Sequence, residues 1–215
     1  MSSREDLISA LSSDLQSVRP VVNIDLMAAA WLVLSALYVV AATHWFGPIR
    51  PNAFSQLAAE PRFLVETLCG VAAITLTAFT AFRAAIPGAL TSRFAIVALV
   101  LMGVWLACYG IGLVSPALEP SMLGKRAHCI WETFVYGLPP VLLAFVFTRR
   151  LYPLQPVQTA MAFGLAAGMI PALYMQIACM YVPAHLLQFH ILPGLMVVFV
   201  GATIARFGRY PRSGD

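Results

Sequence analysis

Charged side chains are scarce in this sequence of 215 residues: they make up 10% of it, against about 25% of an average soluble domain. Hydrophobic residues make up 60%. So little charge excludes an ordinary water-soluble globular protein. Because each membrane span uses about 20 residues, a chain of this length also has little room for a separate large domain.

Motifs of familiar enzyme classes are missing as well. The sequence contains no Gly-x-Ser-x-Gly nucleophile turn, no glycine-rich phosphate loop and no His-Glu-x-x-His motif. It has no Cys-x-x-Cys redox pair, which argues against a membrane thiol oxidoreductase, and no His-x-x-x-His zinc pair. We therefore do not expect an enzyme, and we expect no obligatory cofactor.

The main feature of the sequence is a series of long apolar runs. Six are long enough to cross about 30 Å of hydrocarbon, which predicts an all-α integral membrane bundle of about six helices. The first is too long for a signal-peptide core, and acidic residues precede it, so we expect it to remain as a span. The expected spans cover residues 22–46, 63–82, 94–114, 129–147, 159–180 and 186–205.

Basic residues at the ends of these runs predict the orientation. With the N-terminus in the cytoplasm, nine arginines face inward and four basic residues outward, so both termini are expected on the cytoplasmic side of an inner membrane. The net charge of +4 thus indicates topology rather than direct binding to nucleic acid. We expect four tryptophans to act as anchors at the lipid interfaces: Trp31, Trp45, Trp105 and Trp131.

The segment before the first span reads as an amphipathic helix over residues 2–18, capped by Ser2 with Glu5. Its apolar stripe comprises Leu7, Ile8, Leu11, Leu15 and Val18. Two interpretations stay open: a helix lying on the bilayer, or a helix that docks into a groove on a cytoplasmic protein. We divide the chain into residues 1–20, the six-helix domain 21–208 and a cytoplasmic tail 209–215.

The fifth span contains a small-xxx-small pair, Gly164 and Gly168, which predicts close packing against another helix. Prolines inside the apolar runs are expected to kink their helices. These prolines are Pro139, Pro140, Pro171 and Pro193.

Four cysteines from four different spans are all expected near the outer membrane face, where thiols form disulfides. They are Cys69, Cys108, Cys129 and Cys179. Glu66 and Glu132 lie one helical turn from two of them, and His128, His185 and His190 add imidazoles at the same level. A soft or borderline metal site and a thiol-redox site both fit these residues, and so does packing of small buried side chains.

Several segments, taken in order, resemble the NrsF family of bacterial membrane anti-sigma factors. They are DLISALSSDLQSVRPV at 6–21, PRFLVETL at 61–68, AFRAAIPG at 81–88, HCIWETFVYGLPP at 128–140 and GLAAGMIPALYMQIAC at 164–179. The resemblance covers most of the chain.

The resemblance implies a function. It implies that the N-terminal segment, including Asp6 and the apolar stripe, sequesters an extracytoplasmic-function (ECF) sigma factor, and that the membrane domain senses a stress beyond the bilayer. Cys129 and Cys179 stand where the family has a pair of outer cysteines; the resemblance assigns no role to Cys69 or Cys108. A small transporter or channel is the alternative, since Glu66, Glu132 and the prolines fit one.

Overall fold

In the computed structural model of this protein, residues 3–13, 23–149 and 151–208 are described. Five of the long helices are α2 (Ile24–Phe46), α4 (Pro61–Ala84), α5 (Ser92–Gly112), α6 (Cys129–Thr148) and α7 (Pro156–Ala178). The sixth is made of three consecutive pieces: α8 (Pro183–Leu186), the π-helix η1 (Leu187–Ile191) and α9 (Leu192–Phe207). Two short helices complete the described chain: α1 (Arg4–Ser13) and α3 (Ala53–Ala59). The all-α prediction is confirmed.

The six long helices have the length and apolar composition needed to cross a membrane. Their ends carry ordinary stop and start signals: Asn23 caps α2 through its side chain, and Pro61 and Pro156 open α4 and α7. Large apolar side chains such as Leu99, Val146 and Phe199 remain exposed on the outside of the bundle. A surface of this kind is stable against lipid and not against water, so the chain is a multi-pass membrane protein.

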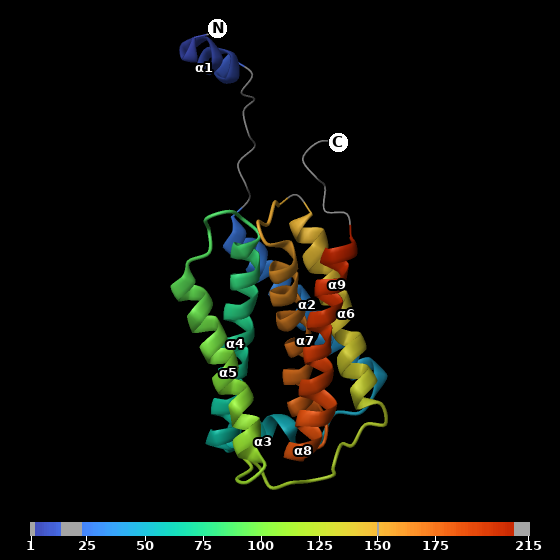
Figure 1. The fold of residues 1–215 in the computed structure, drawn as a ribbon. Helices are drawn as coiled ribbons and strands as arrows, with labels where there is room; N and C mark the ends of the chain where they lie inside the picture. The colour runs from blue at the N-terminus through green and yellow to red at the C-terminus, as the bar shows by residue number, and fades with distance from the viewer. Residues whose placement is uncertain (1–2, 14–22, 150, 209–215) are drawn as a thin grey trace.

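Helix α7 is the centre of the bundle. In Figure 1 it lies among the other long helices, and 72% of its most apolar 18-residue window is buried, against 22–44% for the other five. The bundle has two ends: α2 begins and α9 ends at the one we call proximal, and α3 and α8 lie at the other, which we call distal (Figure 1). Helix α7 therefore contacts most of the other helices, so a change in its position affects the packing of most of the bundle.

Glycines bring α7 and α9 into close contact. A Cβ atom added to Gly164 would lie 2.7 Å from the carbonyl oxygen of Val197, and one added to Gly168 would overlap the carbonyl oxygen of Gly194. Gly201 of α9 approaches the backbone of α7 at Ala160 in the same way. The Gly164–Gly168 pair thus faces α9, where the small residues allow the two backbones to approach.

Replacing Gly168 by alanine is expected to destabilise the bundle by about 1–3 kcal/mol, because backbone atoms of α9 must move away from the new methyl group. Gly103→Ala is the matched control: nothing lies within 4 Å of its Cβ position, so the added methyl should be neutral or stabilise the helix by up to about 1 kcal/mol. Thermal unfolding of the detergent-solubilised protein measures both. Equal melting temperatures for the two variants would contradict the close approach.

Two of the four tryptophans do not lie at an interface. Trp31 and Trp105 are completely buried, whereas Trp45 and Trp131 are exposed, so the anchoring prediction was wrong for the first pair. The Trp31 indole nitrogen donates a hydrogen bond of 2.9 Å to the carbonyl of Pro140. Trp31 therefore joins α2 to α6 at the double proline.

All four prolines lie inside long helices, as the apolar runs indicated. Pro139 and Pro140 lie inside α6 and Pro171 lies inside α7. Pro193 lies inside the sixth long helix, two residues after η1, where the backbone returns from π-helical to α-helical hydrogen bonding.

The N-terminal helix has a different cap from the predicted one. In α1 the Ser3 side chain accepts a hydrogen bond from the Asp6 backbone, and the Asp6 carboxylate accepts one from Ser3 N–H in return. No residue of α1 is buried, and its three apolar side chains, Leu7, Ile8 and Leu11, are each more than half exposed. Residues 2, 15 and 18 of the predicted helix and the tail at 209–215 lie outside the described residues.

Candidate functional site

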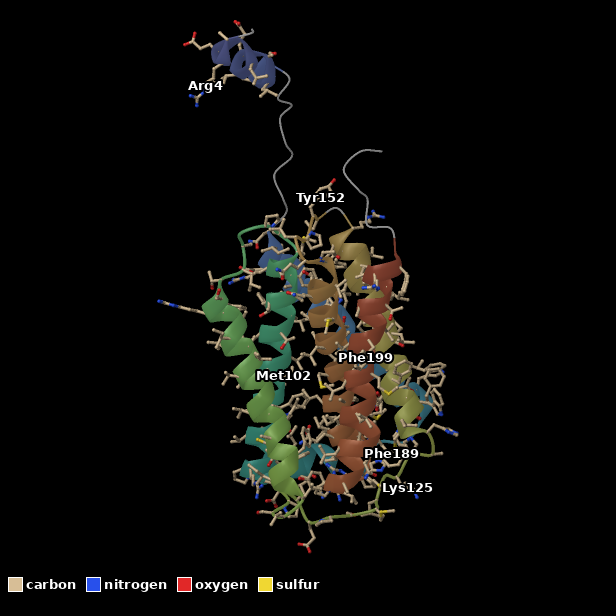
Figure 2. The ribbon with its side chains drawn as sticks, in the orientation of Figure 1. Arg4, Met102, Lys125, Tyr152, Phe189 and Phe199 are labelled. Atoms are coloured by element: carbon tan, nitrogen blue, oxygen red, sulfur yellow. The ribbon has the colours of Figure 1, made fainter. Side chains whose placement is uncertain are left out.

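Backbone hydrogen bonds join the distal loops to one another. Arg50 N–H donates to the carbonyl of Ala178 at 2.8 Å, and Ser121 N–H donates to the carbonyl of Tyr181 at 2.8 Å. The Tyr181 hydroxyl accepts a further bond from Ala117 N–H at 3.0 Å. The loop after α5 is thus fixed to the connection between α7 and α8. Figure 2 shows this region at the end of the bundle marked by Lys125 and Phe189.

Two buried arginines reinforce these loops. Arg126 is 4% exposed; its Nε donates to Glu132 at 2.6 Å and its Nη1 donates to the carbonyl of Pro48 at 2.8 Å. Burial by itself would lower the pKa of Arg126, but the hydrogen bond and charge of Glu132 raise it above the ordinary value. Arg50 lies over the rings of Phe63 and Tyr181, and burial lowers its pKa.

Glu132→Ala is expected to destabilise the protein by about 3–5 kcal/mol, because it leaves the charge of Arg126 buried without a counter-ion. Glu66→Ala is the comparison, since it breaks the ion pair with Arg62, whose side chain is 42% exposed. That loss should be about 1 kcal/mol or less. Chemical or thermal unfolding in detergent gives both values; a similar small loss in the two variants would show that Arg126 is not electrostatically dependent on Glu132.

Between these loops, four potential metal ligands meet. Cys129 is the first residue of α6, Cys179 directly follows α7, His185 belongs to α8 and His190 to η1. The two sulfurs are 3.2 Å apart, and the Cys179 sulfur lies 3.7 Å from His185 Nε2. All four ligand atoms lie within 4.8 Å of one another, and three of the four residues are buried. We call these four residues the distal cluster.

The wide turn of η1 explains why the two histidines share a side. At about 100° per residue, positions five apart in a regular α-helix point roughly 140° away from each other. Here the N–H of Leu192 bonds to the carbonyl of Leu187, five residues back, as in a π-helix, and the two imidazole centroids are 4.9 Å apart. Both histidines were noted in the sequence, but their spacing matches no ligand pair of a regular helix. They were therefore not among the main site residues that we predicted.

The remaining candidates lie outside the distal cluster. Glu132 is held by Arg126, and Glu66 is held by Arg62 on α4. Cys108 of α5 lines a surface hollow beside Glu66, and Cys69 is partly exposed on α4. His128 precedes α6 and makes no capping bond through its side chain. The structure thus brings together one pair of the four cysteines, Cys129 with Cys179.

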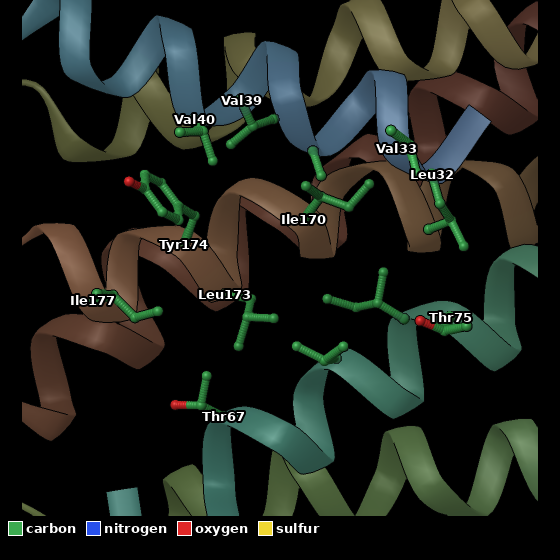
Figure 3. Close-up of a pocket in the computed structure, with 13 residues that line it drawn as sticks. Leu32, Val33, Val39, Val40, Thr67, Thr75, Ile170, Leu173, Tyr174 and Ile177 are labelled. Atoms are coloured by element: carbon green, nitrogen blue, oxygen red, sulfur yellow. The ribbon is translucent and has the colours of Figure 1, made fainter. Parts of the chain in front are cut away.

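A second feature is an apolar cavity of 340 Å³ between α2, α4 and α7 (Figure 3). Its lining is mostly aliphatic, including Leu32, Ile170 and Leu173. Two of its hydroxyl groups already have hydrogen-bond partners: the Thr67 hydroxyl donates to the carbonyl of Phe63 in its own helix, and the Tyr174 hydroxyl is hydrogen-bonded to His44 at 2.8 Å. No acidic or basic side chain lines it, so the cavity is suited to a lipid chain rather than to an ion.

Comparison with known proteins gives a match to a protein family. No curated protein and no solved structure matches the chain. The family model described as "NrsF: Negative regulator of sigma F" matches residues 11–208, which include all six long helices, both cysteines and both histidines of the distal cluster. A negative regulator of a sigma factor has a sigma factor as its partner. The chain belongs to the NrsF family of negative regulators of sigma F.

Proposed function

We propose that this protein is a membrane anti-sigma factor that holds an ECF sigma factor at the cytoplasmic face and releases it after a chemical change at the distal cluster. In this proposal the proximal end faces the cytoplasm of a bacterial inner membrane and the distal end faces the periplasm. The observation that carries it is the family match, together with a bundle that has an exposed apolar helix in its N-terminal segment and a thiol pair at its distal end.

The N-terminal helix supplies the binding arm. Leu7 and Leu11 are 57% and 63% exposed, one helical turn apart, with Ile8 beside them. An amphipathic helix with an uncovered apolar stripe is a standard ligand for a groove on another protein. The Asp6 carboxylate accepts the capping bond from Ser3 N–H and keeps its negative charge on the exposed surface of α1, where it is available to the partner.

The distal thiols supply the signal. Cys129 and Cys179 lie at the distal ends of α6 and α7, so a bond between them, or through a shared soft metal ion, fixes the relative position of two long helices. In the redox form, two thiols give two protons and two electrons to a hydroperoxide, which becomes an alcohol and water, and one S–S bond forms.

The free energy that such a signal supplies is comparable to the free energy that a switch needs. Shifting a two-state bundle from 1:99 to 99:1 takes about 5.5 kcal/mol of differential interaction. A disulfide contributes about 2–5 kcal/mol, and binding of a metal through thiolates about 10 kcal/mol or more. Either change is of the required order.

Co-purification tests the binding arm. The full chain and a variant lacking residues 2–20 are expressed at equal levels, solubilised and captured, and bound ECF sigma factors are identified by mass spectrometry. The full chain is expected to carry a sigma factor and the truncated chain none. Equal sigma factor on both would place the binding site elsewhere, and none on either, with the sigma factors expressed, would contradict the proposal.

A further inference from the structure

The histidines of the distal cluster have no part in a purely thiol-based signal, yet their environment indicates a definite role. His190 is completely buried, and its Nδ1 lies 3.1 Å from the Thr133 hydroxyl. Its other nitrogen, Nε2, makes no hydrogen bond of good geometry among the described residues, although the ring interacts with the Cys179 sulfur. A buried polar atom without a well-aligned partner costs about 1–3 kcal/mol, and a thiol is only a weak hydrogen-bonding group, so the site favours a stronger partner for this nitrogen.

The contact with Thr133 orients His190 as a ligand. When Nδ1–H donates to the Thr133 hydroxyl, Nε2 carries the lone pair. Metal-bound histidines are commonly fixed in this way, with one ring nitrogen on the metal and the other donating to a neighbouring group. Thr133 is one helical turn from Cys129 on α6, so a single helix both contributes a ligand and orients a second one.

The donor set and its dimensions suit a tetrahedral ion. Two thiolates and two imidazoles are a frequent ligand set for Zn²⁺, and ligand atoms around such an ion lie about 3.3–3.8 Å apart. The 3.7 Å between the Cys179 sulfur and His185 Nε2 lies within this range. The two sulfurs, 3.2 Å apart, must separate by about 0.5 Å, because two thiolates on such an ion lie about 3.8 Å apart. The widest separation, at most 4.8 Å, requires a contraction of about 1 Å.

Charge balance favours the same class of ion. Two thiolates neutralise a divalent cation, and neutral imidazoles add no charge, so the filled site is neutral overall. A neutral site is the least costly one to bury at the end of an apolar bundle. Binding replaces two S–H bonds by two metal–sulfur bonds and releases two protons to water.

We propose that Cys129, Cys179, His185 and His190 form a four-coordinate site for a borderline divalent ion of the Zn²⁺ class. The ion joins α6, the end of α7 and η1 at one point. Because a sulfur bound to metal is not free to enter a disulfide, the filled site and the Cys129–Cys179 disulfide exclude each other. The role of this ion as the signal rests on the proposed function; its binding does not.

Metal titration of the purified full-length chain tests the site. The reduced, metal-free protein in detergent is titrated with Zn²⁺ against a chromophoric chelator, and with Co²⁺, whose visible spectrum reports tetrahedral geometry and thiolate ligation. One ion per chain and a tetrahedral thiolate spectrum are expected. His185→Gln and His190→Gln should each weaken binding and alter the Co²⁺ spectrum, and Thr133→Val should weaken it by about 10–100-fold. His128 lies outside the cluster, so His128→Gln should change neither the metal affinity nor the Co²⁺ spectrum.

Thiol protection gives a measurement that does not depend on the folding of any variant. In the wild type, Zn²⁺ is expected to prevent the Cys129–Cys179 disulfide that a hydroperoxide forms in the metal-free chain, measured by maleimide labelling after the protein is denatured, and to leave the labelling of Cys69 and Cys108 unchanged. Failure to bind Zn²⁺ with the thiols reduced, or unchanged affinity in both imidazole variants, would overturn the four-ligand site. Sigma-factor capture by the metal-free chain is scored separately, so loss of one proposal leaves the other standing.

Discussion

Replacing both Leu7 and Leu11 by glutamate is expected to weaken capture of the sigma factor by at least about 100-fold. Each leucine buried in a groove contributes about 1.5–3 kcal/mol, and 1.4 kcal/mol corresponds to a factor of ten. The two side chains lie on the same face of α1 and are both more than half exposed, so their loss should not disturb the bundle. Affinity is measured with the purified chain and the sigma factor that co-purifies with the wild type.

Ser9→Glu is the matched control for this experiment. Ser9 lies on the opposite side of α1 from the apolar stripe, so Ser9→Glu adds one negative charge, against two in the double leucine variant, to the same helix without touching the binding face. It should retain the affinity of the wild type within a few-fold. If Ser9→Glu and the double leucine variant lose affinity equally, charge and not the apolar stripe controls binding, and the helix-in-groove interpretation fails.

Cys179→Ser is expected to abolish the release of the sigma factor in response to a hydroperoxide. A disulfide needs both sulfurs, and the Cys179 sulfur is completely buried with Cys129 as its neighbour at 3.2 Å, so no other described cysteine replaces it. The amount of sigma factor bound to the chain is compared before and after treatment. The wild type should lose most of it, whereas the variant should keep the amount bound before treatment.

The other two cysteines provide controls of the same chemistry. Cys69→Ser and Cys108→Ser remove thiols that lie on α4 and α5, outside the distal cluster, and both variants should respond as the wild type does. A response that survives in Cys179→Ser but is lost in Cys108→Ser would relocate the sensing thiol to the α4–α5 side of the bundle.

The six spans were predictable because lipid places a strong and simple demand on sequence. A run of about 20 apolar residues has few alternatives to a helix across the bilayer. The predicted run at 63–82, for example, lies within α4 (Pro61–Ala84), and the differences are confined to the ends. The seven-residue α3 was not predicted, because a helix of this length depends on its contacts with α4 and α7 rather than on a pattern of its own.

Which side of a helix faces the bundle was much less predictable. Trp31 and Trp105 were assigned to the interface by residue type, but tertiary packing buries both. In a membrane the lipid is as apolar as the interior, so hydrophobicity does not distinguish the outward face from the inward one. The small residues of α7 are informative for this reason: Gly164 and Gly168 mark the contact with α9.

Two of the four residues of the distal cluster, the cysteines, were predicted from the sequence as a pair. Cys129 and Cys179 were paired through the family resemblance, but nothing local places the first residue of α6 next to the residue that follows α7. His185 and His190 were expected at the level of the thiols, but a spacing of five does not place two side chains on one side of a regular helix. The π-turn at Leu187–Ile191 is a property of the folded chain, and it places both imidazoles beside the thiols.

The most direct test of the account is the distribution of the sigma factor between membrane and cytosol, measured by fractionating cells with and without this chain. In unstressed cells that contain the chain, the sigma factor is expected in the membrane fraction. It should become soluble after thiol oxidation, and it should be soluble throughout in cells that lack the chain. A sigma factor that stays soluble in unstressed cells despite full expression of the chain would contradict it.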